Sequence, residues 1–384
     1  MKKMKLKKMC IGITDGSHNP PEGIEKSGFP MLSSKNIFDD NITLDEPRYL
    51  TEMDFEKENE RTKVNSGDVL LTIVGTVGRV AVVDDMIGRI TLQRSVAVLH
   101  PDKNICISRY LMYLLISKRD FFGKNARGVA QKGIYLKQLG DMEFSICDLS
   151  QQMDIVCKLD KIQKLIMMEK EQVEDYEKLI RSYFKQIFGG YFQNHINEKR
   201  LCEICSFIDY RGKTPKKSQL GVPLITARNV KDNKFFIEPR EFIPEENYND
   251  VMSRGLPKVN DVLFTTEAPL GNVCRIPNIY EKFCVGQRLI TMQPHDGVIV
   301  SEYLEYALAS SEFQNKMRQK SSGSTVKGIR SKLLVLLTIP VPPIALQNQF
   351  AAFVHQVDQL KSKTQKSLDK TQLLFNSLMQ QYFG

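Results

Sequence analysis

The second half of the chain repeats the first half at a nearly constant offset, and this repeat constrains the fold more than any other feature. Asp68-Val69-Leu70 is answered by Asp261-Val262-Leu263 after 193 positions (261 − 68). Other matches have offsets of 193 to 195. They are Phe29-Pro30 with Val222-Pro223, Gly78 with Gly271, Gln93-Arg94 with Gln287-Arg288, Ser108-Arg109-Tyr110-Leu111 with Ser301-Glu302-Tyr303-Leu304, and Lys132-Gly133-Ile134 with Lys327-Gly328-Ile329. We therefore expect two copies of one module, which present two similar surfaces.

Two segments with apolar residues at alternating steps of four and three predict long helices that pair with each other. In 148–190 the apolar stripe contains Ile155, Leu159, Ile162, Ile166, Val173, Tyr176 and Ile180. In 342–384 it contains Phe350, Val354, Val357, Leu368, Phe375 and Leu378. The two stripes share one offset of 195 (350 − 155), so the helices have matching length and register. Roughly 38 residues span on the order of 57 Å at 1.5 Å per residue.

The residues that flank these segments predict where each helix begins and ends. Ser150 is placed as an N-cap, and Pro342-Pro343 stiffens the entry to the second helix. Phe188-Gly189 and Phe383-Gly384 predict the C-terminal ends, because glycine readily terminates a helix.

Residues 1–147 and 191–341 have a different pattern, typical of mixed α/β globules. Short β-rich runs at 69–74, 80–83 and 95–99 are separated by turns that contain Gly, Asp, Asn and Pro. One helix in each copy is expected, at Arg109–Lys118 and at Glu302–Ser310. We therefore predict an α+β protein with two similar α/β domains, 1–147 and 191–341, each followed by a long helix, 148–190 and 342–384.

The composition is typical of a globular protein of the cytoplasm. The chain has 384 residues, of which 42% are hydrophobic and 26% charged, enough for more than one core. It has no run of about 18 apolar residues, and its basic start lacks the apolar segment of a secretory signal. The net charge of +9 permits a nucleic-acid partner without requiring one.

A zinc site is one possible use of the eight cysteines. Cys202-x-x-Cys205 has the spacing of half a tetrahedral site, with Cys274 and Cys284 as further thiolates. The repeat argues against this interpretation, because the position in the first copy that matches Cys202 is Lys7. We favour cysteines buried or half-buried in strands, as expected in a reducing compartment.

Motifs of catalysis are missing from the sequence. Asn19-Pro20-Pro21-Glu22 resembles the motif with which amino-methyltransferases hold their target amine, but it lacks the aromatic residue that stacks on a flipped base. There is no nucleotide-binding glycine loop and no repeated pair of carboxylates at a glycine turn, and the five histidines have no metal-ligand spacing. We expect a chain that has no catalytic residue, metal or cofactor of its own.

The globules contain loops in which polar and basic residues lie beside glycine, and these are our candidates for DNA binding. Arg, Lys, Gln and Asn pair with base edges or hold phosphates. The candidates of the first copy are His18, Gly75, Thr76, Gly78, Arg79, Gln93, Arg94, Arg127 and Lys132. Those of the second copy are Arg211, Lys213, Arg228, Gln287, Arg288 and Lys327. Solvated turns are the alternative for any single residue, but recurrence in both copies favours function for the set.

The arrangement resembles the specificity subunit of type I restriction-modification systems. The likeness rests on Asp15-Gly16-Ser17-His18, on a Lys-Gly-Ile turn in each copy, and on Pro342-Pro343 followed by Gln347. It covers the whole chain. The resemblance implies that each globule is a target-recognition domain for one half of a split double-stranded DNA site, and that the two helices form an antiparallel coiled-coil spacer.

The resemblance also implies partners. Two methyltransferase subunits would dock on the helix faces and bring S-adenosylmethionine, and restriction subunits would bring ATP hydrolysis, Mg²⁺ and the nuclease. The complex would be an adenine-specific methyltransferase and an ATP-dependent endonuclease. Because 72–76 and 265–269 differ in sequence, the target should be asymmetric. Two alternatives stay open: a coiled-coil scaffold for protein partners, without salt-dependent DNA binding, and a fused methyltransferase.

Overall fold

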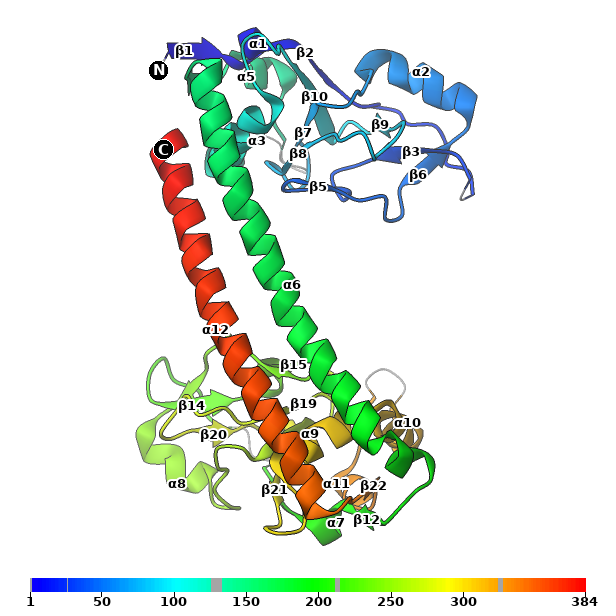
Figure 1. Ribbon diagram of the computed structural model, residues 1–384, viewed down its shortest axis with the longest axis vertical. Coiled ribbons are helices and arrows are strands. Elements are labelled where there is room, and N and C mark those ends of the chain that lie inside the picture. The colour runs from blue at the N-terminus through cyan, green and yellow to red at the C-terminus, as the bar shows by residue number, and fades with distance from the viewer. Residues whose placement is uncertain (1, 26, 126–132, 211–214, 324–326) are drawn as a thin grey trace. The chain divides into compact units, whose positions relative to one another are not determined.

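The computed structural model describes residues 2–25, 27–125, 133–210, 215–323 and 327–384. Contacts divide the chain into unit 1, Met1–Lys170 with Lys366–Gly384, and unit 2, Glu171–Gln365. Two long helices, α6 (Leu149–Gln193) and α12 (Ile344–Phe383), run through both units (Figure 1). Each unit therefore consists of one globule with part of both long helices.

Unit 1 is built around an antiparallel sheet whose alternate residues face opposite sides. Val69 and Leu71 face a core shared with α3 (Ser108–Ser117) and the long helices, whereas Leu70 faces a second core under a small mixed sheet. The main sheet has the order β2 (Cys10–Asp15), β10 (Val96–Pro101), β7 (Val69–Thr72), β8 (Val80–Val82). The other strands are β1 (Lys2–Lys5) with β11 (Glu143–Ile146), β6 (Arg48–Leu50) with β3 (Phe29–Leu32) and β9 (Thr91–Leu92), and β4 (Ile37–Phe38) with β5 (Asn41–Ile42).

Unit 2 has the same sheet order at equivalent positions. Its main sheet is β13 (Cys205–Asp209), β21 (Leu289–Pro294), β18 (Val262–Thr265), β19 (Val273–Arg275). The other strands are β12 (Glu198–Arg200) with β22 (Thr338–Pro340), β17 (Phe242–Ile243) with β14 (Val222–Ile225) and β20 (Cys284–Val285), and β15 (Val230–Lys231) with β16 (Lys234–Phe235). The repeat seen in the sequence is thus a repeat of architecture.

The globules contain more helices than the one per copy that was predicted. The predicted helices are present as α3 (Ser108–Ser117) and α9 (Ser301–Ala309). Unit 1 also has α1 (Leu6–Met9), α2 (Glu52–Thr62), α4 (Arg119–Asn125) and α5 (Leu136–Asp141). Unit 2 also has α7 (Leu201–Ile204), α8 (Tyr248–Val251), α10 (Ser311–Lys320), α11 (Ser331–Leu334) and the 3₁₀ turns η1 (Ala227–Asn229) and η2 (Glu245–Asn247). Most of these are too short to show a helical period.

One sequence match between the copies is wrong by one residue. The backbone N–H of Gln93 donates to Leu32, and that of Gly286 donates to Ile225, so Gln93 corresponds to Gly286 and not to Gln287. The offset at this turn is therefore 193, and Arg94 corresponds to Gln287. The match of Gly133 with Gly328 is confirmed, because each forms an isolated bridge to the second residue after the central strand, Gly133 to Val74 and Gly328 to Glu267.

The start of α6 differs from the prediction. Oδ1 of Asp148 accepts a 2.8 Å hydrogen bond from the backbone N–H of Gln151, so Asp148 caps the helix. Ser150 lies inside the first turn, and its assignment as the N-cap is wrong. A carboxylate has the further advantage of favourable interaction with the helix dipole.

The end of α6 also differs from the prediction. α6 continues through Gly189 to Gln193. The continuation buries Phe192, whose ring lies 5.8 Å from that of Phe184. Burial of an aromatic side chain outweighs the roughly 1 kcal/mol that a helical glycine costs relative to alanine.

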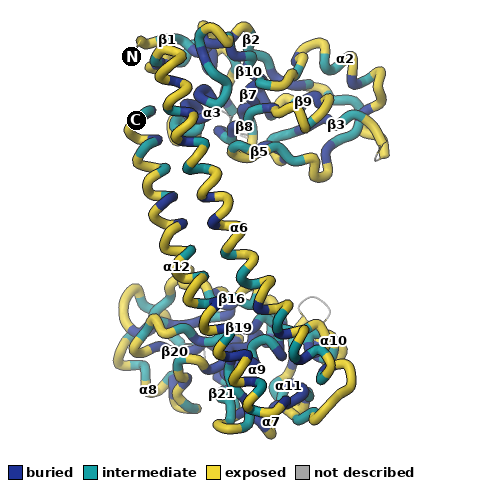
Figure 2. The backbone as a smooth tube through the Cα atoms, in the orientation of Figure 1, coloured by how far each residue is buried: buried dark blue, intermediate teal, exposed yellow. Residues whose placement is uncertain are grey.

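The two long helices pack against each other in antiparallel order within each unit. The N-terminal part of α6 meets the C-terminal part of α12 in unit 1, where Glu169 accepts a hydrogen bond from Ser367. In unit 2 the C-terminal part of α6 meets the N-terminal part of α12, and Lys361 pairs with Glu177. All residues of the two predicted apolar stripes are buried or half-buried, as Figure 2 shows for the alternation along the helices. The buried ones are Leu159, Ile166, Ile180, Phe350, Val354, Val357 and Leu368. The half-buried ones are Ile155, Ile162, Val173, Tyr176, Phe375 and Leu378.

A buried glutamine near the start of each long helix ties the helix to its globule. Gln152 accepts a 2.9 Å bond from the backbone N–H of Ile107 and donates to the carbonyls of Ile105 and Cys147. Gln347 makes the same three bonds 195 positions later (347 − 152), with Val300, Val298 and Pro342. Both side chains are 0% exposed, so each satisfies three backbone groups that water cannot reach.

A repeated carboxylate fixes the start of the central strand in both units. Oδ1 of Asp68 accepts a 2.8 Å bond from Nδ1 of His100, and Oδ2 of Asp261 accepts a 2.7 Å bond from Gln293. Each carboxylate also accepts a 2.7 Å bond from the backbone N–H three residues earlier. The side-chain hydrogen bond to Asp68 raises the pKa of His100, so unit 1 has a titratable group where unit 2 has an amide.

We expect His100→Gln to remove a pH dependence from the stability of unit 1. A raised pKa in the folded state means that the stabilisation is fully present below the unfolded value of 6.5 and is lost as pH rises through the folded value. Urea unfolding of the full chain at pH 6 and pH 8 should show a smaller difference for the variant, since Gln keeps the hydrogen bond at both values. The reciprocal substitution in unit 2, Gln293→His, should enlarge the difference in stability between pH 6 and pH 8. An unchanged difference in His100→Gln would contradict this role.

The cysteines that the zinc alternative invoked do not gather at one place. Cys205 lies in a core with the long helices, whereas Cys274 and Cys284 lie in the other core of unit 2, and Cys202 is exposed. Burial raises the pKa of Cys205 and of Cys284 to about 12. In the part of the chain that the structure describes, no group of three or more His, Cys, Asp or Glu is placed to hold a metal.

Candidate nucleic-acid interface

Four loops of unit 1 meet at the ends of β7, β9 and β3. Ser17 donates its N–H to Leu92 and accepts a 2.9 Å bond from the N–H of Arg94. Oγ of Ser95 accepts a 3.0 Å bond from the N–H of Ser34, and its carbonyl accepts one from Val74. We call this set, residues 16–18, 33–35, 74–76 and 93–95, the unit 1 loop cluster. His18, Lys35 and Arg94 are exposed on it.

Glycine is required where the first of these loops crosses the turn after β9. A Cβ atom on Gly16 would lie 2.1 Å from the carbonyl oxygen of Leu92, so any side chain would displace backbone. This explains the glycine of Asp15-Gly16-Ser17-His18. Asp15 itself is buried and binds His18 at 2.9 Å and also Arg61, which fixes the two ends of the loop.

The corresponding loops of unit 2 also meet. The N–H of Gly286 donates to Ile225, the N–H of Thr266 donates to Arg288, and Glu267 forms a bridge to Gly328. Together with 215–217 and 226–228, residues 266–268, 286–288 and 327–328 form the unit 2 loop cluster. Residues of all these segments except 327–328 line a hollow of about 280 Å³. Its lining includes Pro215, Leu224, Ala227 and Ala268, with Lys217, Arg228, Gln287 and Arg288 among its polar residues.

Carboxylates hold the cations of the unit 2 loop cluster in place. Glu241, whose side chain is 10% exposed, binds Nζ of Lys217 at 2.8 Å and Nη2 of Arg228 at 2.9 Å. Glu267 binds Nε of Arg288 at 3.1 Å. Paired guanidinium groups lose less conformational entropy when they meet a ligand, because their orientation is already restricted.

The structure brings most of the described candidates together but leaves two apart. His18, Gly75, Thr76, Gln93 and Arg94 belong to the unit 1 loop cluster, and Arg228, Gln287, Arg288 and Lys327 belong to that of unit 2. Gly78 instead faces Arg119, and Arg79 lies with its guanidinium 4.8 Å from the ring centre of Phe38. Arg127, Lys132, Arg211 and Lys213 lie outside the described residues.

Three charged residues that form ion pairs at the unit 2 loop cluster were not among the sequence candidates. They are Lys217 and Glu267, within the cluster, and Glu241, which lines the hollow from the segment before β17. Glu241 lies on the segment before β17, far in sequence from the cations that it binds, so no spacing pattern signals the contact. The only sequence signal for Glu267 was that it differs from Val74, the matching residue of the first copy.

A half-buried ion network connects the globule of unit 1 to α6. Nη2 of Arg109, on α3, binds Oδ1 of Asp160 at 2.6 Å and Oδ2 of Asp40 at 2.9 Å. The hydroxyl of Tyr113 donates to Asp160 at 2.6 Å. Burial raises the pKa of Tyr113 above its usual range, and its bond to Asp160 raises it further. The short helix contributes the cation and the long helix the anion.

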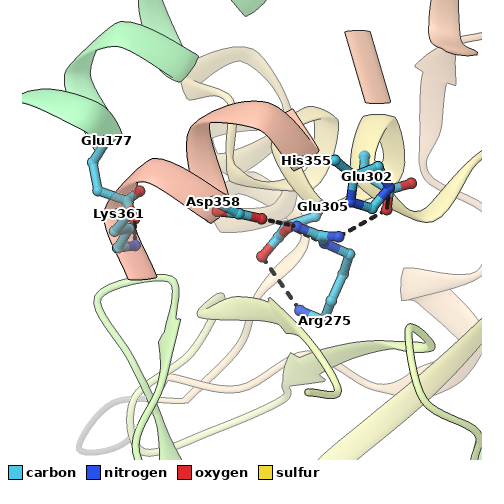
Figure 3. A network of polar contacts seen from close by, with 7 residues as sticks. All are labelled: Glu177, Arg275, Glu302, Glu305, His355, Asp358 and Lys361. Atoms are coloured by element: carbon cyan, nitrogen blue, oxygen red, sulfur yellow. Dashed lines mark hydrogen bonds and ion pairs between the residues drawn. The ribbon is translucent and has the colours of Figure 1, made fainter. Parts of the chain in front are cut away.

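The same place in unit 2 carries the opposite charge. Arg109 is replaced by Glu302, which binds Arg275 of β19 at 2.8 Å. Arg275 also binds Glu305 at 2.7 Å and Asp358 of α12 at 3.2 Å, so one guanidinium joins three carboxylates (Figure 3). Burial raises the pKa of Glu305, and Arg275 opposes that rise. The network holds β19, α9 and α12 in a fixed relation, which positions the sheet that carries the loop cluster.

The sequence matches one protein family in both copies. The family is described as "Type I restriction modification DNA specificity domain", and the matches cover residues 13–175 and 194–370. The chain belongs to this family. Each match begins in a globule and extends into the long helix that follows it, which agrees with the repeated unit of the structure.

Individual relatives and solved structures agree with this assignment. The type I restriction enzyme MjaVIII specificity subunit of Methanocaldococcus jannaschii is 24% identical over 345 residues, which cover 84% of this chain and 80% of the relative. The crystal structure of a type I restriction-modification S subunit from M. genitalium superposes with a TM-score of 0.59 at 17% identity, over 98% of this chain and 94% of the other. A chain from a structural study of type I R-M complex assembly has a TM-score of 0.55 at 17% identity, over 100% and 97%. These structures share the fold of this chain, and the predicted fold class is confirmed.

The long helices include no membrane span. Among the residues that the structure describes, no helix combines enough length with enough apolar character to cross a bilayer.

We expect Arg275→Gln to lower the free energy of unfolding of unit 2 by about 3–5 kcal/mol at neutral pH, because it leaves buried carboxylates without a cation. The destabilisation caused by Arg275→Gln should become smaller as pH falls. The pKa of Glu305 is already raised and rises further without Arg275, so protonation removes the unpaired charge. Urea unfolding of the full chain at pH 7.5 and pH 5 measures both effects. Lys178→Gln, at the exposed pair with Asp175, is the control and should change stability by at most about 1 kcal/mol. A loss independent of pH would contradict the charge mechanism.

Proposed function

We propose that this chain is the DNA-recognition subunit of a type I restriction-modification complex. Each globule, residues 1–148 and 194–343, would be a target-recognition domain that reads one half of a bipartite double-stranded DNA site. The long helices α6 and α12 would set the spacing of the half-sites. The observation that carries the proposal is the duplicated loop cluster: one scaffold, present twice, exposes a different set of polar and basic side chains each time.

The differences between the clusters support an asymmetric target. Arg94 of unit 1 stands where unit 2 has Gln287, and Arg288 of unit 2 stands where unit 1 has Ser95. Arg pairs bidentately with guanine and Gln with adenine, so the two surfaces favour different bases. The exposed cations Lys35, Lys217 and Lys327 would add contacts to phosphates that depend on salt concentration but not on sequence.

The proposed role is recognition and not catalysis. The methyltransferase subunits, two in the proposed complex, would bring S-adenosylmethionine and the restriction subunits ATP and Mg²⁺, so this chain would bind no cofactor. The complex would methylate adenine and cleave DNA with ATP hydrolysis. With DNA as its proposed target, the complex would act in the cytoplasm.

The long helices carry apolar side chains that would serve as the docking surface for methyltransferase subunits. In unit 1 these are Met153, Leu165, Met167, Met168, Leu373 and Leu374, and in unit 2 they are Leu179 and Leu360. All of them are exposed, with Leu373 at 70%. Apolar residues at this density on a helix surface are typical of protein interfaces.

The test is to co-express the chain with a methyltransferase subunit from the same genome and to sequence the host DNA for methylated adenines. Methylation should be confined to one split, asymmetric motif. The purified complex should bind a duplex with that motif, with an affinity that falls steeply between 50 and 200 mM salt.

A host strain that expresses the methyltransferase subunit without this chain is the control, and its DNA should show no such motif. A complex that binds DNA without sequence preference, or no salt-dependent binding at all, would contradict the proposal. The second result is what the alternative of a coiled-coil scaffold for protein partners predicts.

A further inference from the structure

We propose that Arg288, held by Glu267, reads a guanine in the half-site that unit 2 recognises. This inference rests on the proposed function and names one base contact within it. Arg288 would be the residue that contacts the base, and Glu267 would be a positioning residue that does not.

The backbone carbonyl of Arg288 is held by two hydrogen bonds from one residue, Thr266. It accepts a 3.1 Å bond from the N–H of Thr266 and a 3.2 Å bond from the hydroxyl of the same residue. Thr266 follows β18, the central strand, and Glu267 comes next in the chain. The site that presents the guanidinium is therefore anchored to the sheet and not to a free loop, which is what a precise base contact needs.

The ion pair leaves the base-reading end of Arg288 available. Glu267 contacts Nε, the nitrogen nearest the main chain, at 3.1 Å. Within the described residues, no hydrogen bond or ion pair engages Nη1 or Nη2 of Arg288. These two nitrogens match the O6 and N7 acceptors of guanine in the major groove. The side chain is 55% exposed, so duplex DNA can approach it.

Arg228, the other arginine of this cluster, is held in the opposite way. Its terminal Nη2 binds Glu241 at 2.9 Å, and the same carboxylate binds Lys217. A guanidinium whose terminal nitrogen already has a carboxylate partner is less suited to a bidentate base contact. We therefore assign guanine readout to Arg288, and phosphate positioning to Arg228 and Lys217.

Unit 1 has no equivalent of this pair. The backbone carbonyls of Ser95 and Arg288 each accept a hydrogen bond from the residue that follows the central strand of their own sheet. Ser95 therefore corresponds to Arg288, and Val74 corresponds to Glu267. Oγ of Ser95 is turned inward to the N–H of Ser34. A guanine contact from this position is thus specific to unit 2, and the half-site of unit 1 provides an internal control.

The Arg288–Glu267 pair can be removed without unfolding the domain. Both side chains are about half exposed, and exposed ion pairs contribute little to stability. Changes in DNA selection after substitution therefore report on recognition.

The experiment selects bound duplexes from a randomised pool with the full chain assembled with its methyltransferase subunit. Arg288→Ala should lose the preference for one guanine in one half-site by roughly 10- to 100-fold, with the other half-site unchanged. Glu267→Gln should weaken the same preference less, while affinity for DNA of any sequence stays equal or rises. Arg288→Lys should keep affinity better than Arg288→Ala.

Arg240→Ala is the matched control. Its Nε binds Glu238 at the same 3.1 Å, in an exposed pair of the same unit that does not line the hollow. It should leave both half-sites unchanged. If Arg288→Ala keeps the full guanine preference, or Arg240→Ala loses it equally, the assignment of Arg288 is overturned while the proposed function stands. If the unaltered complex selects no two-part motif, the proposed function itself fails.

Discussion

Each globule is held by the first turns of one long helix and by the last turns of the other, and the rest of the structure depends on this packing. Gln152 and Gln347 bond the helix starts to the loops that lead into α3 and α9. At the helix ends, the ring of Phe383 lies 5.2 Å from that of Tyr110, and the ring of Phe188 lies 4.7 Å from that of Tyr303. Two repeated contacts per unit fix how the sheet, and therefore the loop cluster that it carries, is oriented on the helices.

The repeated contacts are apolar or amide-based, whereas the charged contacts differ between the units. Arg109 is the cation of the network in unit 1, and Glu302 is an anion at the same place in unit 2. A buried charge needs a partner of opposite sign, so an inversion at one residue requires changes at its neighbours, here Arg275 and Asp358. The two globules have the same architecture but are not interchangeable on their helices. The same division applies to the loop clusters, where backbone bonds are repeated and the exposed side chains are not.

Patterns with a strict period were predicted well, and positions set by single contacts were not. The offset of 193 to 195 gave the repeated globules, and the steps of four and three gave both helices. The match of Gln93-Arg94 to Gln287-Arg288 was wrong, because two similar letters one position apart outweighed the true register, which the backbone bonds of Leu32 and Ile225 define. The helix end at Gly189 was wrong because burial of Phe192, invisible in local sequence, outweighs a weak glycine preference.

The sequence by itself determined that the chain has two α/β modules and two helices of equal register, because periodicity and repetition are properties of the chain that need no partner in space. Only the tertiary structure decided which loops meet, that Asp148 caps α6, and that Glu267 orients Arg288 while Glu241 holds Arg228. These contacts join residues far apart in the chain or depend on which nitrogen of a guanidinium faces a carboxylate. No spacing in the sequence encodes that choice, since it follows from how the strands and loops pack.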